Sequence, residues 1–412
     1  MFRRILPIIL LTFVNVIGFS LLIPVLPFVV EQYHGNAFTF GLLLATYPAF
    51  QFLASPVLGS LSDRFGRRPI LILSQTGTLL SWVVFGLAYF VPDISLGRIA
   101  LPLWMIAFSR IVDGITGGNI SVANAYLADI TRPQERTHAY GILGAVFGIG
   151  FIIGPVLGGW TANGDWGFLG TVILAATISL VTLIIMILRL PESLKHKQKT
   201  WHFAWSDELN GFKRITEYRD HPFLRHFLTL NFFLAFTFSG YTSILVLFIK
   251  DKFSLSPGQI GQLFLIIGLY LIVNQGLLVK RISHRIGNLR TFLIGQGLMI
   301  LGLIGLLFVH NLVVFLLDAY IINLGFSLSF PTFKAVINNV VPPAEQGKIN
   351  GVAESINSIN AAIAPLLAGW LYLHWQRFTF SVFAVFMLLP YVYYLLRFPM
   401  LNQAYQATRR QK

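Results

Sequence analysis

The sequence predicts an all-α integral membrane protein with twelve transmembrane helices in two pseudo-symmetric six-helix bundles. Its 412 residues are 55% hydrophobic and only 11% charged, whereas soluble proteins carry about 25% charged residues. Apolar runs of about 20 residues, the length that crosses a bilayer core as a helix, recur along the whole chain. In addition, part of the second half repeats part of the first.

The twelve predicted spans are read directly from the apolar runs. The first run follows Arg3 and Arg4 and is too long for a signal-peptide core, so we expect it to be retained as a helix. There is no cysteine, which excludes disulfides and thiol chemistry. The spans are 5–30, 39–60, 69–91, 101–127, 138–162, 167–190, 223–249, 258–279, 289–309, 312–337, 348–373 and 378–397.

The positions of the basic residues predict the topology. With both termini cytoplasmic, only Arg98, Lys250, Lys252 and Arg377 of the 30 Lys and Arg fall on the outer side, and Arg110 lies inside the membrane. Cytoplasmic loops are enriched in Lys and Arg, so we expect a multi-pass protein of the cell (inner) membrane in this orientation. The net charge of +14 lies at span ends, where it meets anionic membrane lipids, and not in a continuous patch for nucleic acid.

An internal repeat predicts the domain organisation. Residues 128–160 align without gaps to residues 338–370, with Pro155 and Trp160 matching Pro365 and Trp370. We therefore expect one six-helix bundle at 1–190, a second at 223–412, and a cytoplasmic linker at 191–222 whose apolar spacing predicts an amphipathic helix. Two such parallel repeats are typical of secondary transporters, with the substrate site between the halves near the membrane midplane.

Two motifs give the chain a family resemblance. "GSLSDRFGRRP" occupies 59–69, and "GILGAVFGIGFIIGPVLGG" occupies 141–159. With "SRIVDG" and "AYLADIT" in span four, they resemble the major facilitator superfamily, in its twelve-span drug/proton antiporter branch, and the tetracycline and multidrug efflux transporters in particular. The resemblance covers nearly the full chain. It implies export of small amphipathic compounds in exchange for protons, by alternating access.

The loop at 59–69 is the candidate cytoplasmic gate. Its glycines permit a tight turn, and the positive-inside bias explains its arginines without any gating role. That simpler explanation does not account for Asp63, because acids contribute little to topology. The resemblance implies that Asp63 faces the positive N-terminal end of span eleven and that Arg67 pairs with Asp129. The implied gating residues are Gly59, Asp63, Arg64, Gly66, Arg67 and Asp129.

The fifth-span motif has two interpretations. Small residues let membrane helices pack closely, which is a structural role. The resemblance implies that the same packing lets the helix bend during alternating access, and both roles can hold together. The motif residues are Gly141, Gly150, Gly154, Pro155, Gly158 and Gly159.

Four ionisable residues lie within predicted spans and are candidates for proton coupling: Arg110, Asp113, Asp318 and Glu354. Each costs roughly 2.5–3.5 kcal/mol near a helix centre, so each requires a partner or a wet cavity. Arg110 and Asp113 are three residues apart and share a helix face, so Asp113 is either the counter-ion of Arg110 or a proton carrier. Glu354 fits a pathway or a cytoplasmic gate, and Asp318 fits a structural hydrogen bond.

The chain departs from the tetracycline exporters at two positions. The resembled proteins carry an acid in the first helix, where Asn15 stands, and another in the third, where Ser81 stands. Neither replacement titrates, so any proton coupling must use other groups. Polar residues within spans are candidate cavity-lining groups, although each can equally form an interhelical hydrogen bond. They are Asn15, Gln51, Asn119, Asn231, Gln296 and Asn357.

The sequence offers no indication of enzymatic chemistry. It contains no P-loop, no clustered metal-ligating residues and no hydrolase motif, so we expect no enzyme, no cofactor and no metal. The expected partners are a small-molecule substrate, protons and membrane lipids, with the chain acting as a monomer. The alternatives are a metabolite, sugar or siderophore carrier of the same fold, and a transport-inactive membrane receptor.

Overall fold

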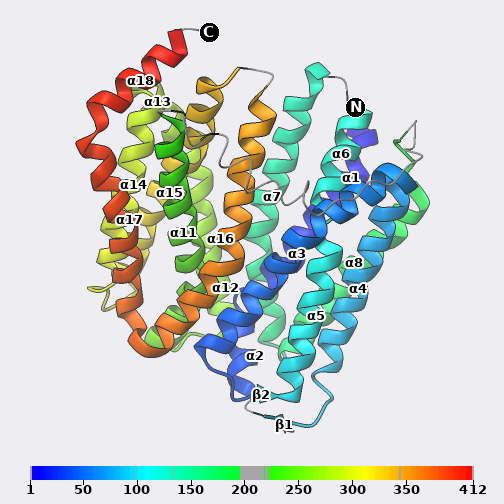
Figure 1. The fold of residues 1–412 in the computed structure, drawn as a ribbon. Helices are drawn as coiled ribbons and strands as arrows, with labels where there is room; N and C mark the ends of the chain where they lie inside the picture. Colours follow the sequence, from blue (N-terminus) through cyan, green and yellow to red (C-terminus); the bar gives the residue numbers. More distant parts are fainter. Residues whose placement is uncertain are drawn as a thin grey trace. The chain divides into compact units, whose positions relative to one another are not determined.

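The computed structural model describes residues 2–97, 99–131, 133–194, 218, 221, 223–342 and 345–410. Almost all of the described chain is helical (Figure 1). The strands of this described part form one short antiparallel hairpin, β1 (Ser95–Leu96) with β2 (Ile99–Ala100). Contacts divide the chain into two compact units, Met1–Ala204 with Ile249–Leu265, and Trp205–Phe248 with Ile266–Lys412.

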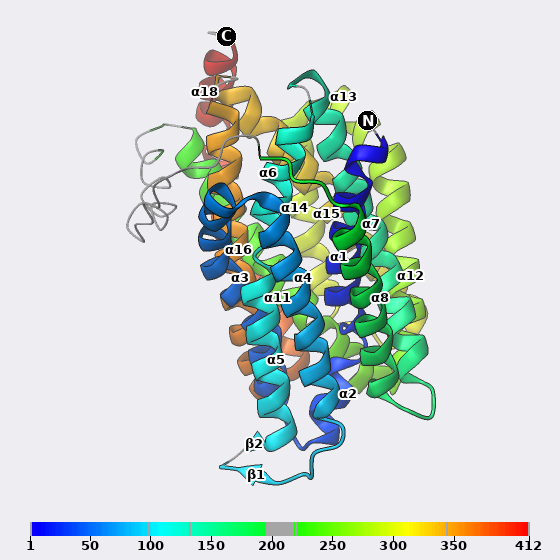
Figure 2. The same ribbon diagram turned by 90° about the vertical axis from the view of Figure 1, so that its right-hand side faces the viewer.

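The helices before residue 195 belong to the first unit. Figure 2 shows its N-terminus and the β1–β2 hairpin at opposite ends of that unit, as expected for a loop reached after three membrane crossings. The helices are α1 (Phe2–Leu21), α2 (Leu26–Gln32), α3 (Ala37–Phe65), α4 (Arg67–Leu87), α5 (Leu101–Gly117), α6 (Ile120–Ile130), α7 (Pro133–Ala162) and α8 (Phe168–Arg189).

The helices after residue 222 build most of the second unit, although the end of α11 and the start of α12 fall in the first. They are α11 (Leu224–Phe253), α12 (Pro257–Val273), the π-helix η1 (Asn274–Val279), α13 (Lys280–Ile286), α14 (Asn288–Gly305), α15 (Leu312–Val340), α16 (Gln346–Trp375), the 3-10 helix η3 (Gln376–Phe378), α17 (Thr379–Leu396) and α18 (Phe398–Arg410).

These helices form the predicted twelve-span, all-α membrane fold. In the described chain, nine helices are long and apolar enough to cross a bilayer unaided, one of them the run Gln346–Leu396 that joins α16 and α17. Counting α16 and α17 separately, and adding the bent pair α1–α2 and the consecutive helices α5 and α6, gives twelve spans. The chain is therefore a multi-pass membrane protein.

Two spans expected to be continuous are broken. The first bends by 43° between α1 and α2. Pro24 and Pro27 explain this break, because proline removes a backbone donor and clashes with the preceding turn. Span four ends its first helix at Gly117 and resumes at Ile120, since two consecutive glycines favour the helix poorly.

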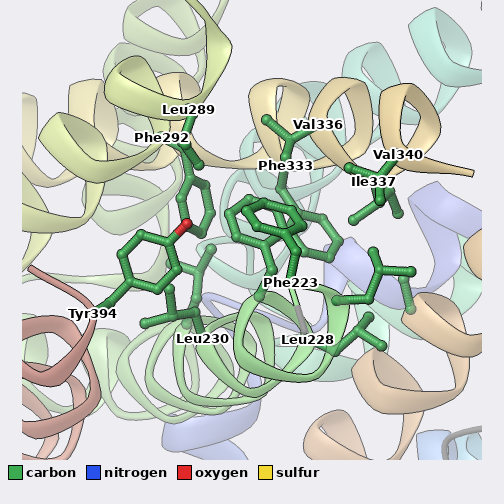
Figure 3. Packing of buried hydrophobic residues seen from close by; sticks show 14 of the residues in the cluster. Phe223, Leu228, Leu230, Leu289, Phe292, Phe333, Val336, Ile337, Val340 and Tyr394 are labelled. Atoms are coloured by element: carbon green, nitrogen blue, oxygen red, sulfur yellow. The ribbon is translucent and has the colours of Figure 1, made fainter. Parts of the chain in front are cut away.

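Aromatic packing forms the core of the second unit. Phe227 of α11 lies 4.7 Å from Phe292 of α14 and 5.2 Å from Phe333 of α15, measured between ring centroids. Phe223 and Tyr394 are fully buried in the same cluster (Figure 3). Buried aromatic pairs contribute roughly 0.5–1.5 kcal/mol each beyond the area they bury. This cluster therefore fixes three helices and the end of α17 to one another.

Two segments lie outside the twelve spans, the linker between the bundles and the C-terminal helix. Most of the linker at 191–222, where we expect an amphipathic helix, lies outside the described residues. The C-terminal helix α18 was not predicted, because its polar composition falls below the apolar signal used to identify spans. It buries Leu401 and Tyr405 against the core of the second unit.

Candidate functional site

A buried ion pair lies at the centre of the first unit. The Arg110 guanidinium approaches the Asp113 carboxylate at 2.7 Å, and the two residues are only 3% and 5% exposed. The guanidinium also lies over three aromatic rings, 5.1 Å from the ring centroid of Trp82, 5.7 Å from that of Tyr47 and 6.0 Å from that of Phe85. An Arg held by both a carboxylate and ring faces can stay charged away from water.

The Asp113 carboxylate lies beside a serine of the neighbouring helix. Ser81 of α4 is fully buried, interacts with Asp113, and donates its hydroxyl to the Thr78 carbonyl at 2.7 Å. Ser81 is the position where the resembled tetracycline exporters carry an acid. The acid of this chain therefore comes from α5 but reaches the same part of the bundle.

Three predicted cavity residues of the first unit form hydrogen bonds between helices. Asn15 donates to Asn119 at 3.1 Å, and Asn119 donates to Ser74 of α4 at 2.7 Å. On α3, Gln51 donates to the Tyr47 hydroxyl at 3.0 Å and to the Gly117 carbonyl at 2.9 Å. A polar chain thus crosses from α1 to α4, and the break between α5 and α6 supplies the carbonyl that binds Gln51.

The other three predicted cavity residues belong to the second unit. Asn231 and Gln296 are each 1% exposed, and the Asn231 amide nitrogen and the Gln296 amide oxygen find no hydrogen-bond partner in the described structure. Asn357 donates to the Glu354 carboxylate at 3.5 Å. Buried polar groups without partners cost free energy unless water or a ligand satisfies them, which makes Asn231 and Gln296 the better cavity candidates.

The acids of the second unit differ in their surroundings. Asp318 of α15 is 7% exposed, approaches Gly305 of α14, and has one carboxylate oxygen without a hydrogen-bond partner among the described residues. Glu354 of α16 is exposed. Within the described residues neither forms an ion pair, so the structure joins Arg110 to Asp113 but does not join Asp318 to Glu354.

The loop between α3 and α4 is organised around Arg67. Its guanidinium lies 2.6 Å from the Asp63 carboxylate, 2.5 Å from the Ser62 hydroxyl and 3.4 Å from the Asp129 carboxylate. Gly66 has a φ of 111°, a conformation that side chains rarely adopt. The contact of Arg67 with Asp129 that the resemblance implies is therefore present within the first unit. Asp63 contacts the same guanidinium.

Two further residues of the predicted gate have simpler surroundings. Arg64 is exposed and lies 5.1 Å over the ring of Phe65. Gly59 faces Ser121 of α6, where an added Cβ would meet the hydroxyl at 3.6 Å, an ordinary contact. The structure thus ties Asp63, Arg67 and Asp129 together and leaves Arg64 outside that network.

The fifth-span glycines place α7 directly against α1. A Cβ at Gly154 or Gly158 would overlap Ser20 or the Leu21 backbone, and a Cβ at Gly150 would press on Val16 at 3.0 Å. The Ser20 hydroxyl also donates to the Gly150 carbonyl at 3.1 Å. Gly159 instead faces Pro257, and α7 runs unbroken through Pro155. The close packing expected of this motif is thus visible at these positions, and Gly141 lies outside the residues whose surroundings the structure describes.

The sequence matches the profile of the Major Facilitator Superfamily over residues 8–365 and again over 228–407. The chain belongs to the major facilitator superfamily. Its members are transporters, so this chain carries a small-molecule substrate.

Individual relatives match this superfamily member along most of its length. It is 28% identical over 373 residues to the tetracycline resistance protein, class H, of Pasteurella multocida, covering 90% of this chain and 89% of the relative. It is 31% identical over 366 residues to multidrug resistance protein 2 of Bacillus subtilis (strain 168), covering 87% and 86%.

A solved structure shows the same fold. The chain superimposes on a bacterial homologue of the human lysosomal transporter Spinster with a TM-score of 0.76 and 13% identity, covering 97% of both chains.

Sequence reasoning missed two contacts in this superfamily member. Glu192, just after α8, accepts hydrogen bonds from the backbone N–H groups of Arg67 at 2.9 Å and Arg68 at 3.2 Å, and so caps the N-terminus of α4. In the sequence, Glu192 is only an acid two residues after a predicted span, and this position does not by itself predict a helix cap. On the opposite side, Lys250 pairs with Glu31 and lies 5.2 Å from the ring of Phe28.

The segment around that second contact packs against α7. Asn163 donates to the Ser256 hydroxyl at 3.4 Å and accepts from the Gly258 backbone at 3.2 Å. Gly159 and Gly261 leave room for the backbones of α7 and α12 to touch. Together with Lys250 and Glu31, these contacts join the α11–α12 loop to the helices of the first unit.

Proposed function

We propose that this protein exports small amphipathic compounds as a secondary active transporter, by proton antiport with alternating access. The relatives that align along 86–89% of their own length are tetracycline and multidrug resistance proteins. The observation that carries the proposal is the buried Arg110–Asp113 pair beside Ser81, because it supplies a titratable acid where the resembled exporters have one.

The proton step follows from the geometry of that pair. A proton taken up by the Asp113 carboxylate neutralises it and so weakens its 2.7 Å interaction with Arg110. The guanidinium then keeps its contacts with Trp82 and Tyr47, so the unpaired cation has other partners while the acid is neutral. Release of the proton restores the ion pair. Asp318 and Glu354 are the further acids that can take part.

Gating has a candidate on each side of the first unit. Asp63, Arg67 and Asp129 form the cytoplasmic group. The Lys250–Glu31 pair and the Asn163 contacts hold the loop between α11 and α12 on the other side. Alternating access requires each set to form and break in turn. In this scheme both termini lie in the cytoplasm, and the chain works as a monomer.

The test is substrate-induced proton movement in proteoliposomes containing the purified chain. Tetracyclines, lipophilic cations, sugars, siderophores and common metabolites form the panel, and internal pH is followed with a trapped dye. Proton flux driven by the amphipathic compounds supports the proposal. Flux only with the other compounds indicates a carrier of the same fold with another substrate, and transport of none of them contradicts export.

A further inference from the structure

The second unit contains a cavity at the start of α14. Its volume is about 510 Å³, and it lies between the α13–α14 turn, the end of α15 and one side of α18. Its polar and charged lining residues include Lys280, His284, Arg290, Asn339, Asn402 and Gln406. Three of these side chains can carry positive charge, and none of the described lining residues is an acid.

The cations of this cavity have no acidic partner among the described residues. Neither Lys280 nor Arg290 forms an ion pair with any residue that the structure describes. The first turn of α14 also lines this cavity. Its cap residue is Gly287, and no described side chain accepts a hydrogen bond from its first N–H groups. Unpaired cations and free N–H groups on one cavity favour a bound anion.

A largely buried tyrosine gives a second indication of a ligand. Tyr405 of α18 is 5% exposed and lines the cavity. Its ring packs on Phe223 at 5.3 Å between centroids, yet its hydroxyl forms no hydrogen bond with a described residue. The phenolic O–H is therefore available to donate a hydrogen bond to a ligand in the cavity.

The first half of the chain fills the equivalent place with its own carboxylate. α4 and α14 each begin after a glycine with positive φ, Gly66 and Gly287. "RLPES" (189–193) follows the sixth span and "RFPML" (397–401) follows the twelfth, so Glu192 corresponds to Met400. Glu192 caps α4. Met400 cannot cap α14, so the second repeat lacks the anion that the first one carries.

We propose that this cavity binds a phosphate-bearing anion, either the headgroup of an anionic phospholipid or a soluble phosphate. The phosphate oxygens accept from the first N–H groups of α14 and from the Tyr405 hydroxyl, while Lys280 and Arg290 balance the charge. The bound phosphate takes the part in the second repeat that the Glu192 carboxylate takes in the first. This inference does not depend on the transported substrate.

The experiment measures two probes on the full-length purified chain. Native mass spectrometry counts phosphatidylglycerol retained from micelles that also contain phosphatidylcholine. Calorimetry measures inorganic phosphate binding against chloride at equal ionic strength. The variants are Lys280→Gln, Arg290→Gln and Asn402→Glu, the last placing a carboxylate in the cavity. Arg281→Gln is the matched control, because it removes the same charge from α13 but does not line the cavity.

We expect Lys280→Gln and Arg290→Gln each to weaken phosphate or phosphatidylglycerol binding about tenfold, the loss of one charge-assisted contact. Asn402→Glu should weaken binding at least as much, because its carboxylate repels the anion. The control should stay close to the parent protein, and thermal unfolding should confirm that all variants fold. A loss confined to phosphatidylglycerol identifies the lipid headgroup, and a loss for both probes identifies the phosphate group itself. Equal losses in Arg281→Gln and Arg290→Gln, or no binding of either probe by the parent protein, would overturn the proposal.

Discussion

Glu192 and Arg67 join the segment after α8 to the first turn of α4, through a 2.9 Å hydrogen bond from the Arg67 N–H to the Glu192 carboxylate. The same arginine uses its side chain to reach Asp63 and Asp129. Its backbone is therefore fixed by one acid while its guanidinium is shared between two others. The candidate cytoplasmic gate is thus anchored to the sixth span through Glu192. Two further hydrogen bonds, from Arg68 to the Ile187 carbonyl and from Ser193 to the Asp129 carboxylate, strengthen the same connection.

The first prediction tests this anchor. Glu192→Gln removes a negative charge from the positive end of α4 and should lower the free energy of unfolding by roughly 0.5–1 kcal/mol. Thermal or denaturant unfolding in detergent measures the change. Asp165→Asn is the control, because Asp165 is exposed and forms no ion pair with a described residue. An equal shift in both variants would mean that Glu192 acts only through overall charge.

The second prediction separates gating from folding at Asp63. This side chain is 37% exposed, so its ion pair with Arg67 contributes little stability. We expect Asp63→Asn to unfold at the parent temperature but to transport several-fold more slowly, because the gate loses one of the two carboxylates that share Arg67. Initial transport rates in proteoliposomes give the comparison. Parent-like rates in a folded variant would remove Asp63 from the gating scheme.

The third prediction concerns the proton carrier. Asp113→Asn should abolish proton-driven accumulation while sparing downhill substrate movement, since the amide keeps the volume but does not titrate. Because Ser81 lies beside Asp113, the double variant Ser81→Asp, Asp113→Asn returns a carboxylate to the same part of the bundle. We expect it to recover part of the proton coupling. Accumulation by Asp113→Asn alone would make Asp113 a counter-ion and direct attention to Asp318 and Glu354.

The fourth prediction concerns the opposite side of the first unit. Lys250→Gln removes one partner of the Glu31 pair, which should shift the protein away from the state in which this side is closed. The charge-reversed double variant Glu31→Lys, Lys250→Glu should restore parent behaviour. Accessibility of a single cysteine introduced at Ser256 reports the shift, since the chain has no cysteine of its own. Unchanged labelling in Lys250→Gln argues against a gating role.

The fifth prediction concerns pH. His221 Nδ1 accepts from the backbone N–H groups of Phe223 and Leu224, at 3.3 and 3.1 Å, where α11 begins. Burial lowers the pKa of His221 below its usual 6.5. The unfolded chain therefore binds this proton more readily, and stability falls as pH drops below about 6.5. His221→Asn keeps an acceptor without titrating, so its unfolding temperature should depend less on pH between about 5 and 7. Identical pH profiles would contradict this.

The sequence predicts the twelve spans well because bilayer thickness imposes a long apolar run on each one. It predicts their breaks poorly, since Pro24 and Pro27 stand within a run that remains apolar. The contact between Arg110 and Asp113 can be predicted from the sequence, because residues three apart in a helix lie on the same face. The contact between Glu31 and Lys250 cannot be predicted in this way, because it depends on the packing of helices that are far apart in the chain. Glu192 is missed for the same reason.

The contact of α1 with α7 also constrains how the chain enters the membrane. Ser20 and Gly150 are 130 residues apart, so α1 emerges from the ribosome long before its partner exists. In the meantime the Ser20 hydroxyl can donate to the Val16 carbonyl of its own helix, at 2.8 Å, and so needs no second helix to cross hydrocarbon. The first span can therefore remain in the bilayer as a single helix until α7 has been synthesised. A bulkier residue at Gly154 should leave insertion intact and act later, when the two helices meet.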